Sequence, residues 1–588
     1  MVGGTRWFAA IRQTIRPQLI ELIFYSFFVN ILALVIPLFV LQVYNRVVAF
    51  GNIATLQGLV GGVALALLFD FLLRQIRSRL IQRVALRLDM GLSDLLMKKI
   101  WALPLRHLEN RSTSYWLGLF RDTDTVRNTV AGPPFLLLVD LPFAILFIIL
   151  IFIIAKPIAW VFLSFIPIFI LLAAISGKMV AKASDAEKNS RRSRDSIIGD
   201  MIGSRGTVKA LSLDRGLAKM SEAVFADTVE QSLKRGVRQD GFINAGTVLT
   251  LSTTVVITSF GALAIINQEL SIGALIAANM LSNRVISPFS QLVGAWKNFA
   301  SFRQSMTRLT EVMKMPTERE VETIFPDQPT GYMKAENITF KYASDGEPVL
   351  ENLSVDFKPN AVHMLMGPNG GGKSTLAKLL KGLYMPEDGR VLLDGADISQ
   401  FTRSQLAQWI GYVPQETVML QGSIRENIAG LRDDISDADI IEACSKVGIH
   451  QMISNFPDGY GTDVGEAGSA LSGGIRQRLS IARVLVGKPA VLLFDEPTAS
   501  LDRQAENAFR DLLKTLSEEA TIIVISHSPI LLGATDFLHL VDRKRIILSG
   551  PRDDVLKAID QKSRQMTANG DSNGKDPKIG GKSEAWGA

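Results

Sequence analysis

The chain has 588 residues, 47% of them hydrophobic, and its 63 lysines and arginines against 57 aspartates and glutamates give a net charge of +6. A chain of this length holds two or three domains. Its single cysteine, Cys444, excludes an intrachain disulfide and a cysteine-rich metal site. The basic residues lie mostly beside long apolar runs, which favours a membrane surface over nucleic acid as their partner.

Six segments in the first three hundred residues are long and apolar enough to cross a membrane, which takes about 20 helical residues. They are residues 22–44, 53–69, 134–155, 158–177, 242–267 and 270–296. The last is the weakest because Arg284 interrupts it. Helices of a soluble core could explain any one run, but six together predict a membrane domain.

The loops between these segments alternate in basic charge. Lysine and arginine are dense in residues 74–127 and 178–238, sparse near Lys156 and absent between the fifth and sixth segments. Because basic loops stay on the cytoplasmic side, the pattern places the N-terminus, both long loops and the C-terminal half in the cytoplasm. Both loops have a helical pattern. We expect them to turn near residues 111–121 and 190–206 and to touch the C-terminal domain there.

Asp140, in the stretch VDLPF near the start of the third segment, allows two interpretations. An ionisable group inside a membrane segment is costly and often functional. The alternative, which we favour, is an aspartate at the cytoplasmic edge that caps a helix. Pro142 then marks a kink or a helix start.

Beyond residue 332 an alternating strand pattern, MKAENITFKY, leads to VHMLMGPNGGGKST. Gly367, Gly372, Lys373 and Ser374 match the P-loop pattern G-x-x-x-x-G-K-[ST] between a strand and a helix. Backbone N–H groups of such a loop wrap phosphates, while the lysine binds the β and γ groups and the hydroxyl reaches Mg²⁺. The residues predicted to bind nucleotide here are Gly367, Pro368, Asn369, Gly370, Gly371, Gly372, Lys373, Ser374 and Thr375.

A second motif, VLLFDE, ends a buried strand at Asp495 and Glu496. At the C-terminal edge of a parallel sheet, both carboxylates are expected beside the P-loop. One is expected to hold Mg²⁺ through water and the other to polarise the attacking water. Two surface acids at a strand end are the alternative, which the accompanying P-loop disfavours.

With these motifs in order, residues 332–556 resemble the nucleotide-binding domain of an ABC transporter, and the whole chain resembles an ABC exporter half-transporter. Further motifs fit: Tyr342 as the adenine-stacking aromatic, Gln415 as the Q-loop, LSGG at 471–474 as the signature, residues 500–502 as the D-loop, and His527 as the switch histidine. Ile475 departs from the family, which usually has Gln there, but the groups expected to contact phosphate are kept.

The resemblance implies a membrane protein in which an all-α, six-helix ABC exporter transmembrane domain is fused to an α/β P-loop nucleotide-binding domain. The expected division is residues 1–310 for the transmembrane domain, 311–331 for a linker, 332–560 for the nucleotide-binding domain and 561–588 for a disordered tail. It also implies that ATP and Mg²⁺ bind.

Nucleotide-binding domains of this family pair head to tail, so Ser472, Gly473 and Gly474 are expected to contact ATP on the partner's P-loop. One P-loop and one signature per chain then imply a homodimer. The resemblance assigns Glu496 as general base, His527 as the γ-phosphate contact and Gln415 as a sensor. The Mg²⁺ residues are Ser374, Gln415 and Asp495, and Tyr342 and Asp502 join the nucleotide contacts. The alternative for His527 is a buried structural histidine.

Three membrane motifs, IPLFVLQVYNRVV, FRDTDTVRN with LLVDLPFAILF, and SIGALIAANMLSNRVISP, resemble the permease–ATPases of type I secretion systems. This implies ATP-driven export of an unfolded protein across the inner membrane of a Gram-negative bacterium, with a membrane-fusion adaptor and an outer-membrane duct as partners. Because the first segment begins at residue 22, we expect no peptidase domain before it. The resemblance therefore narrows to the protease- and lipase-exporting branch, whose substrates carry an uncleaved C-terminal signal.

Two other functions stay open. An exporter of lipids or small hydrophobic molecules with the same architecture would need a larger apolar or aromatic cavity and no partner proteins. An ATP-gated regulator or channel would bind nucleotide with little turnover, and the presence of Glu496 and His527 disfavours it.

Overall fold

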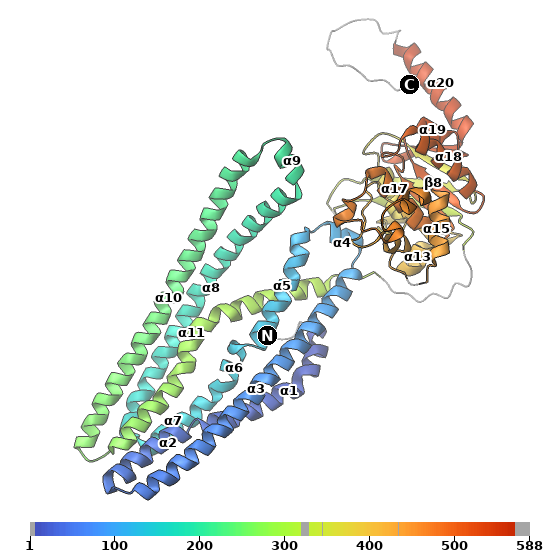
Figure 1. The fold of residues 1–588 in the computed structure, drawn as a ribbon. Coiled ribbons are helices and arrows are strands. Elements are labelled where there is room, and N and C mark those ends of the chain that lie inside the picture. Colours follow the sequence, from blue (N-terminus) through green and yellow to red (C-terminus); the bar gives the residue numbers. More distant parts are fainter. Residues whose placement is uncertain (1–5, 319–328, 344, 433, 571–588) are drawn as a thin grey trace. The chain divides into compact units, whose positions relative to one another are not determined.

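The computed structural model describes residues 6–318, 329–343, 345–432 and 434–570, and the chain forms two compact units (Figure 1). The first unit comprises Met1–Leu103 and Leu108–Thr317, and the second comprises Pro104–His107 and Glu318–Ala588. Residues 319–328 of the predicted linker and 571–588 of the predicted tail lie outside the described residues. The predicted fold class is confirmed: the first unit is helical and the second is α/β.

Long helices dominate the first unit (Figure 1). They are α1 (Arg6–Leu32), α2 (Val35–Gln42), the π-helix η1 (Val43–Val48), α3 (Ile53–Trp101), α5 (Thr113–Val130), α6 (Pro133–Asp140), the 3₁₀ turn η2 (Leu141–Phe143), α7 (Ala144–Ile154), α8 (Lys156–Gly203), α9 (Arg205–Ala210), α10 (Asp214–Ile266) and α11 (Ile272–Lys314). The short α4 (Leu105–Glu109) follows α3. Several of these helices extend far beyond the apolar segments, as the loop pattern predicted.

Among the described residues, five helical stretches are long and apolar enough to cross a membrane. They are Ile15–Val48, Ile53–Trp101, Thr113–Ile154, Lys156–Gly203 and Asp214–Ile266, and they match the first five predicted segments, of which the third and fifth extend one residue further. The chain is therefore a multi-pass membrane protein. The sixth predicted segment lies in α11, which is not among the five because polar side chains interrupt it. That it crosses the membrane remains a prediction.

The turning points of the long loops differ from those predicted. The first lies around α4, because Pro104 follows the end of α3 and Ser112 starts α5 by accepting a hydrogen bond from the Tyr115 N–H. Residues 113–121 are therefore helical. The second lies between Ser204 and Leu213, since α8 continues without a break through Gly203. Helix-forming residues on both sides carried each helix further than its polar composition suggested.

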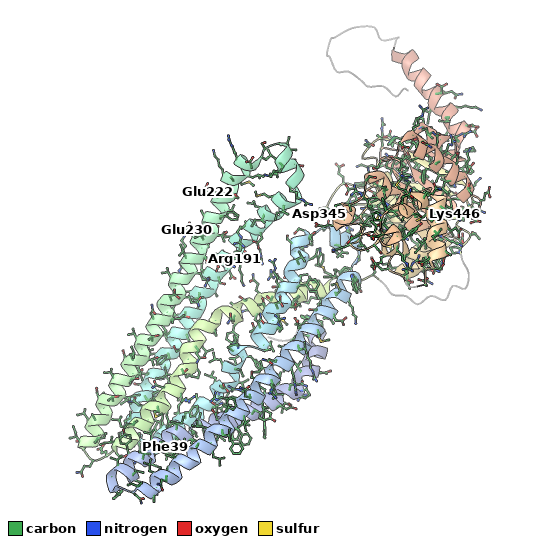
Figure 2. The ribbon with its side chains drawn as sticks, in the orientation of Figure 1. Phe39, Arg191, Glu222, Glu230, Asp345 and Lys446 are labelled. Carbon is green, nitrogen blue, oxygen red and sulfur yellow. The ribbon has the colours of Figure 1, made fainter. Side chains whose placement is uncertain are left out.

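Helices α8 and α10 pack along much of their length, and their parts outside the predicted membrane segments carry exposed charges such as Arg191, Glu222 and Glu230 (Figure 2). Between the two helices, the Arg235 guanidinium pairs with the nearly buried Glu187, and Ser190 Oγ lies 3.0 Å from Thr228 Oγ1. These contacts replace apolar packing where the helix pair leaves the apolar segment. They help to hold the two long helices together beyond the apolar segments.

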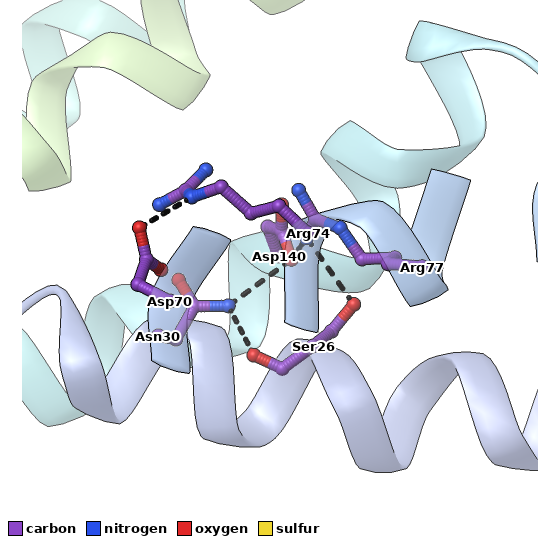
Figure 3. Close-up of polar contacts among 6 residues, drawn as sticks. All are labelled: Ser26, Asn30, Asp70, Arg74, Arg77 and Asp140. Carbon is purple, nitrogen blue, oxygen red and sulfur yellow. Dashed lines mark hydrogen bonds and ion pairs between the residues drawn. The ribbon is translucent and has the colours of Figure 1, made fainter. Parts of the chain in front are cut away.

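Asp140 does not cap a helix, which corrects the interpretation we favoured. It ends α6, and its side chain makes no capping hydrogen bond to η2. Its carboxylate instead lies 3.2 Å from Arg77 Nη1 of α3 and accepts a hydrogen bond from Asn30 Nδ2 of α1 at 3.1 Å (Figure 3). Pro142 lies in the turn between α6 and α7, as the predicted kink requires. Asp140 therefore joins three helices electrostatically.

The second unit contains two sheets. A four-stranded antiparallel sheet has the order β2-β1-β4-β5, and a six-stranded sheet has the order β10-β9-β3-β8-β7-β6 with only β10 antiparallel to its neighbour. The strands are β1 (Met333–Phe340), β2 (Leu350–Phe357), β3 (Val362–Met366), β4 (Asp388–Leu393), β5 (Ala396–Asp397), β6 (Ile410–Val413), β7 (Val491–Asp495), β8 (Thr521–Ile525), β9 (Phe537–Asp542) and β10 (Arg545–Pro551).

Nine helices complete this unit among the residues described after 318. They are α12 (Lys373–Leu380), α13 (Arg403–Trp409), α14 (Ile424–Ala429), α15 (Asp437–Lys446), α16 (His450–Ser454), α17 (Gly473–Leu485), α18 (Arg503–Leu516), α19 (Pro529–Leu532) and α20 (Arg552–Gly570). Because α20 continues to Gly570, the tail predicted as disordered from residue 561 is helical at its start. Its Lys, Gln, Arg and Met residues favour a helix more than the polar composition suggested.

Two buried histidines form a hydrogen-bonded chain inside the six-stranded sheet. His363 Nε2 lies 3.0 Å from the Lys358 carbonyl, His363 Nδ1 lies 3.0 Å from His539 Nε2, and His539 Nδ1 lies 2.8 Å from Ser549 Oγ. Because the carbonyl can only accept, His363 donates to it from Nε2. In its neutral form His363 then accepts at Nδ1 from His539 Nε2, and His539 accepts at Nδ1 from the Ser549 hydroxyl. Burial lowers the pKa of His363 to about 4 and that of His539 to about 3.

The histidine pair predicts acid sensitivity. Both pKa values lie below the ordinary 6.5, so the unfolded chain binds more protons between pH 6.5 and 4. The pair's contribution to stability is therefore complete above pH 6.5 and is lost as the pH falls towards 4. We expect the pair to lower the free energy of unfolding by about 4 kcal/mol from pH 7 to pH 5.

Unfolding of the purified chain at both pH values measures this loss. The variant His539→Gln should lose about half as much on acidification, while His107→Gln, in the partly exposed α4, should match the parent chain. An unaltered pH response in His539→Gln would contradict the assignment.

Candidate functional site

The carboxyl edge of the six-stranded sheet collects most of the predicted site residues. Strands β3, β8, β7 and β6 are parallel neighbours in that order. The P-loop follows β3, His527 follows β8, Asp495 and Glu496 end β7, and Gln415 follows β6. In open α/β sheets this edge is where ligands bind. Residues more than 150 positions apart in the sequence thus share one edge of the sheet.

The P-loop backbone depends on two glycines. Gly367 has φ +150°, and a Cβ there would lie 1.9 Å from the Val541 carbonyl oxygen. Gly372, at the start of α12, has φ +91°, which side-chain-bearing residues rarely adopt. The resulting loop folds over Lys373, whose ammonium donates to the Gly367 carbonyl at 2.7 Å and the Pro368 carbonyl at 3.0 Å. Burial lowers the pKa of Lys373, and the neighbouring Glu496 and Asp495 carboxylates oppose that shift.

Asp495 and Ser374 provide oxygen ligands suited to Mg²⁺. Asp495 is 1% exposed, and its Oδ1 atom has no hydrogen-bond partner. Burial raises the pKa of Asp495, while a hydrogen bond from Ser374 and the charge of Lys373 act in the opposite direction. A buried carboxylate oxygen without a partner, next to a hydroxyl, fits a hard divalent cation that keeps phosphates and waters as its other ligands. Gln415 is exposed, and among the described residues it makes no hydrogen bond to Asp495 or Ser374.

Glu496 has an uncommon backbone conformation. Its φ is +48°, and its N–H donates to the Ile525 carbonyl at 2.9 Å, which fixes the residue between β7 and β8. A non-glycine residue in this region costs roughly 1–3 kcal/mol and is most often found at functional sites. The Glu496 Oε1 atom lies 3.9 Å from His527 Nε2. Burial raises the pKa of Glu496, and burial together with the Lys373 charge lowers the pKa of His527.

Tyr342 lies next to the P-loop helix. Its hydroxyl is 2.8 Å from Thr375 Oγ1, and its ring meets Phe340 and Tyr384 edge to face. The side chain is 42% exposed, so ring surface stays open to a stacking partner. This geometry is compatible with the adenine contact implied by the resemblance.

The signature residues 472–474 make their contacts outside the group formed by the P-loop, Asp495, Glu496 and His527. Ser472 caps α17 by accepting a hydrogen bond from the Ile475 N–H, and Gly473 and Gly474 lie against Ser500 of the D-loop. Among the described residues, no hydrogen bond or ion pair joins residues 472–474 to the P-loop. Asp502 likewise caps α18, accepting from the Ala505 N–H at 2.8 Å.

The departure at Ile475 has a packing explanation. Its side chain is partly buried against the larger core cluster of the second unit. Its backbone N–H still reaches Ser472. An apolar residue therefore replaces the usual Gln without disturbing the cap of α17.

Sequence reasoning missed the role of Arg106. Residues Pro104–His107 belong to the second unit, where Leu105 packs against the smaller core cluster. Arg106 Nε donates to the Tyr342 carbonyl at 3.0 Å, and its guanidinium lies 3.7 Å from Glu387 and over the Phe340 ring. Pro104 was the available signal, because a proline ends a helix and exposes the residues that follow.

Comparisons with known proteins agree with this geometry. The family model described as "ABC transporter" matches residues 350–499, and that described as "ABC transporter transmembrane region" matches residues 19–289. A leukotoxin export ATP-binding protein, LtxB, of Aggregatibacter actinomycetemcomitans is 30% identical over 94% of this chain and 78% of that protein. The chain belongs to the ABC transporter family. It is an ATP-hydrolysing transporter with a transmembrane domain and an ATP-binding domain.

Two further comparisons extend the match. This ABC transporter is 31% identical to the leukotoxin translocation ATP-binding protein LktB of Mannheimia glucosida, over 94% of this chain and 78% of that protein. A solved structure of a bacterial Atm1-family ABC exporter with ATP bound superposes with a TM-score of 0.81, covering 96% of this chain and 99% of that chain. Its sequence identity is 22%, so that likeness concerns the fold.

If Glu496 activates the attacking water, Glu496→Gln should lower the ATP turnover number at least about a hundredfold, since general-base catalysis contributes 10²–10⁴. The raised pKa also sets the pH dependence. A base works only when deprotonated, so the acid limb of the turnover–pH profile should lie above the pH where an ordinary glutamate titrates. Glu518→Gln, at an exposed position after α18, is the control. Undiminished turnover in Glu496→Gln would contradict the role.

The contacts of Arg106 predict a coupling defect. Arg106→Ala removes the hydrogen bond to the Tyr342 carbonyl, and we expect the number of ATP molecules hydrolysed per transport event to rise severalfold, as for loss of about 1 kcal/mol. Transport and ATPase rates measured in parallel test this. Arg111→Ala removes a guanidinium that lies over the Tyr115 ring within the first unit, and serves as the control. Equal coupling in both variants would contradict the prediction.

Proposed function

We propose that this ABC transporter is the permease–ATPase of a type I secretion system that exports an unfolded protein across the bacterial inner membrane. The observation that carries the proposal is the near-full-length similarity to leukotoxin export and translocation proteins, at 30–31% identity. The three membrane motifs point the same way. The proposal includes a homodimer, a membrane-fusion adaptor and an outer-membrane duct as partners.

The contacts of the signature support the homodimer. Gly473 and Gly474 lie beside Ser500 in their own chain, and within the described part of the chain residues 472–474 make no hydrogen bond to their own P-loop. We assign Ser472 and the Gly473 and Gly474 backbone to ATP bound by the partner's P-loop. A two-fold axis then creates two equal composite sites.

Within each composite site, the chain's own residues divide the work. The P-loop and Lys373 bind the phosphates, and Tyr342 offers its ring to the adenine. Glu496 takes the proton of the attacking water, and His527, held 3.9 Å from it, keeps Glu496 and the γ-phosphate in register. We assign Mg²⁺ to Ser374, Asp495 and Gln415. The cation, when bound, would neutralise charge on the phosphates.

The geometry around Tyr342 supports a route for coupling. Tyr342, whose ring we assign to adenine, accepts a hydrogen bond from Arg106 at its backbone carbonyl. The segment that contains Arg106 interrupts the first unit in sequence. A shift of Tyr342 on nucleotide binding would therefore pull on a residue continuous with α3. Gln415, at the end of β6, remains our proposed second sensor of the membrane domain.

The protease- and lipase-exporting branch, with its uncleaved C-terminal signal, remains a prediction. The relatives named above are leukotoxin exporters, so they support protein export without choosing that branch. The alternative function, export of lipids or small hydrophobic molecules, is compatible with the shared Atm1-family fold, which fixes architecture alone.

The proposed function predicts a change in the secreted proteins. In cells that express the chain, Lys373→Ala removes the P-loop ammonium. We expect one or a few proteins to be absent from the medium and to accumulate inside the cells. Quantitative mass spectrometry of medium and cells measures this. Lys488→Ala, on the exposed surface of the second unit, is the control and should secrete normally. Identical secreted proteins in the Lys373→Ala and parent cells would contradict type I secretion.

A further inference from the structure

The first unit contains a cleft of about 750 Å³ between α5, α6, α10 and α11. Of the twelve lining residues among those the structure describes, seven carry a hydroxyl or amide, and none is charged or aromatic. Asn128 and Thr129 belong to the α5 side, and Ser290, Gln291, Asn298 and Ser301 belong to α11. Pockets for small ligands are lined mainly by hydrophobic and aromatic side chains. Hydrogen-bonding side chains in this lining lie beside apolar ones, a mixture that matches the polar backbone and apolar side chains of a polypeptide.

The wall on the α5 side has a fixed shape. At Gly132, between α5 and α6, a Cβ would lie 2.0 Å from the Asn128 carbonyl oxygen, so a side chain there requires backbone movement. Pro133 and Pro134 then start α6 with fixed φ angles. The sequence AGPP thus fixes the backbone that holds the polar residues at the end of α5 against α11. The shape of this wall of the cleft is therefore set by the backbone.

The polar wall continues along one face of α11. Ser301, Asn298, Gln291, Ser287 and Arg284 follow one another at helical spacings of three, seven, four and three residues. Gln291 Nε2 donates to Ser287 Oγ at 2.8 Å. Arg284 is exposed and has no ion-pair partner among the residues the structure describes. A charged residue within a predicted membrane span marks a functional surface by default.

The chemistry of this surface identifies its occupant. An extended polypeptide offers one N–H donor and one C=O acceptor per residue, which hydroxyl and amide side chains satisfy regardless of the sequence. From Arg284 to Ser301 the helix rises about 25 Å, the length of roughly eight extended residues. Arg284 at one end can pair with a carboxylate of the passing chain.

We propose that the cleft and the polar face of α11, from Arg284 to Ser301, bind the extended backbone of the exported polypeptide. This assignment rests on the proposed function and names the surface that handles its cargo. The binding selects for a backbone rather than for particular side chains. The exposed Arg284 adds a preference for acidic segments.

Site-directed photocrosslinking tests the proposal in the full chain. Cys444 is fully buried, and burial raises the pKa of its thiol to about 11, so a maleimide reagent labels an introduced cysteine in preference. Asn298→Cys places a benzophenone-maleimide in the cleft. Ile153→Cys places it on α7, where the side chain is 74% exposed, as the matched control. Both are illuminated in cells that express the chain.

We expect peptide adducts from a secreted protein at position 298 and phospholipid adducts at position 153. Phospholipid adducts at 298, or no peptide adduct there, would overturn the cleft assignment. The Lys373→Ala comparison of secreted proteins separates the two failures. If cargo is lost from the medium but 298 captures no peptide, the site is wrong and the secretion function stands. If the secreted proteins are unchanged, both fail.

A second variant measures the hydrogen-bonding role. Asn298→Leu should reduce secretion of the cargo about fivefold, as expected for one lost hydrogen bond, whereas Asn298→Gln keeps the amide and should retain most secretion. Asn189→Leu, at an exposed position on α8, should leave secretion unchanged. Secretion from Asn298→Leu equal to the parent, at equal transporter levels in the membrane, would overturn the proposal.

Discussion

The carboxyl edge of the parallel sheet buries charges that the fold leaves incompletely paired. Lys373 is 7% exposed and donates to two carbonyls of its own loop, while Asp495 has a carboxylate oxygen with no partner. Burying such groups without full compensation costs stability. Phosphates and a cation would complete both at once. The binding of nucleotide can therefore draw on this incomplete electrostatic pairing.

The pairing depends on the order of the strands. Because β8 lies between β3 and β7, His527 and Glu496 emerge from neighbouring strands and the P-loop starts from the next one. The hydrogen bond from the Glu496 N–H to the Ile525 carbonyl links the ends of β7 and β8 directly. The same unit accepts Leu105 and Arg106 from between α3 and α5. The candidate site, Leu105 and Arg106 are therefore parts of one packed unit.

Much of this was readable from the sequence, since its physical basis is local. A glycine-rich loop before Lys373, two acids after four apolar residues and long uncharged runs each carry their meaning within a few positions. Asp140, the turning points and Arg106 were missed or misread because their partners lie far away in the chain. No residue near Asp140 in the sequence predicts its contacts with Arg77 and Asn30. No residue near Arg106 predicts its hydrogen bond to the Tyr342 carbonyl. The start of the tail was misjudged because composition outweighed helix propensity.

The unbroken length of α3 has a mechanical consequence. Its 49 residues form one rod without an internal proline, about 74 Å long at 1.5 Å per residue. Pro104–His107, which belong to the nucleotide-binding unit, follow shortly after its last turn. A rod of this length amplifies rotation: a tilt of about 5° displaces its far end by roughly 6 Å. Small rearrangements beside a nucleotide can thus become ångström-scale strokes at the opposite end, with no hinge needed along the way.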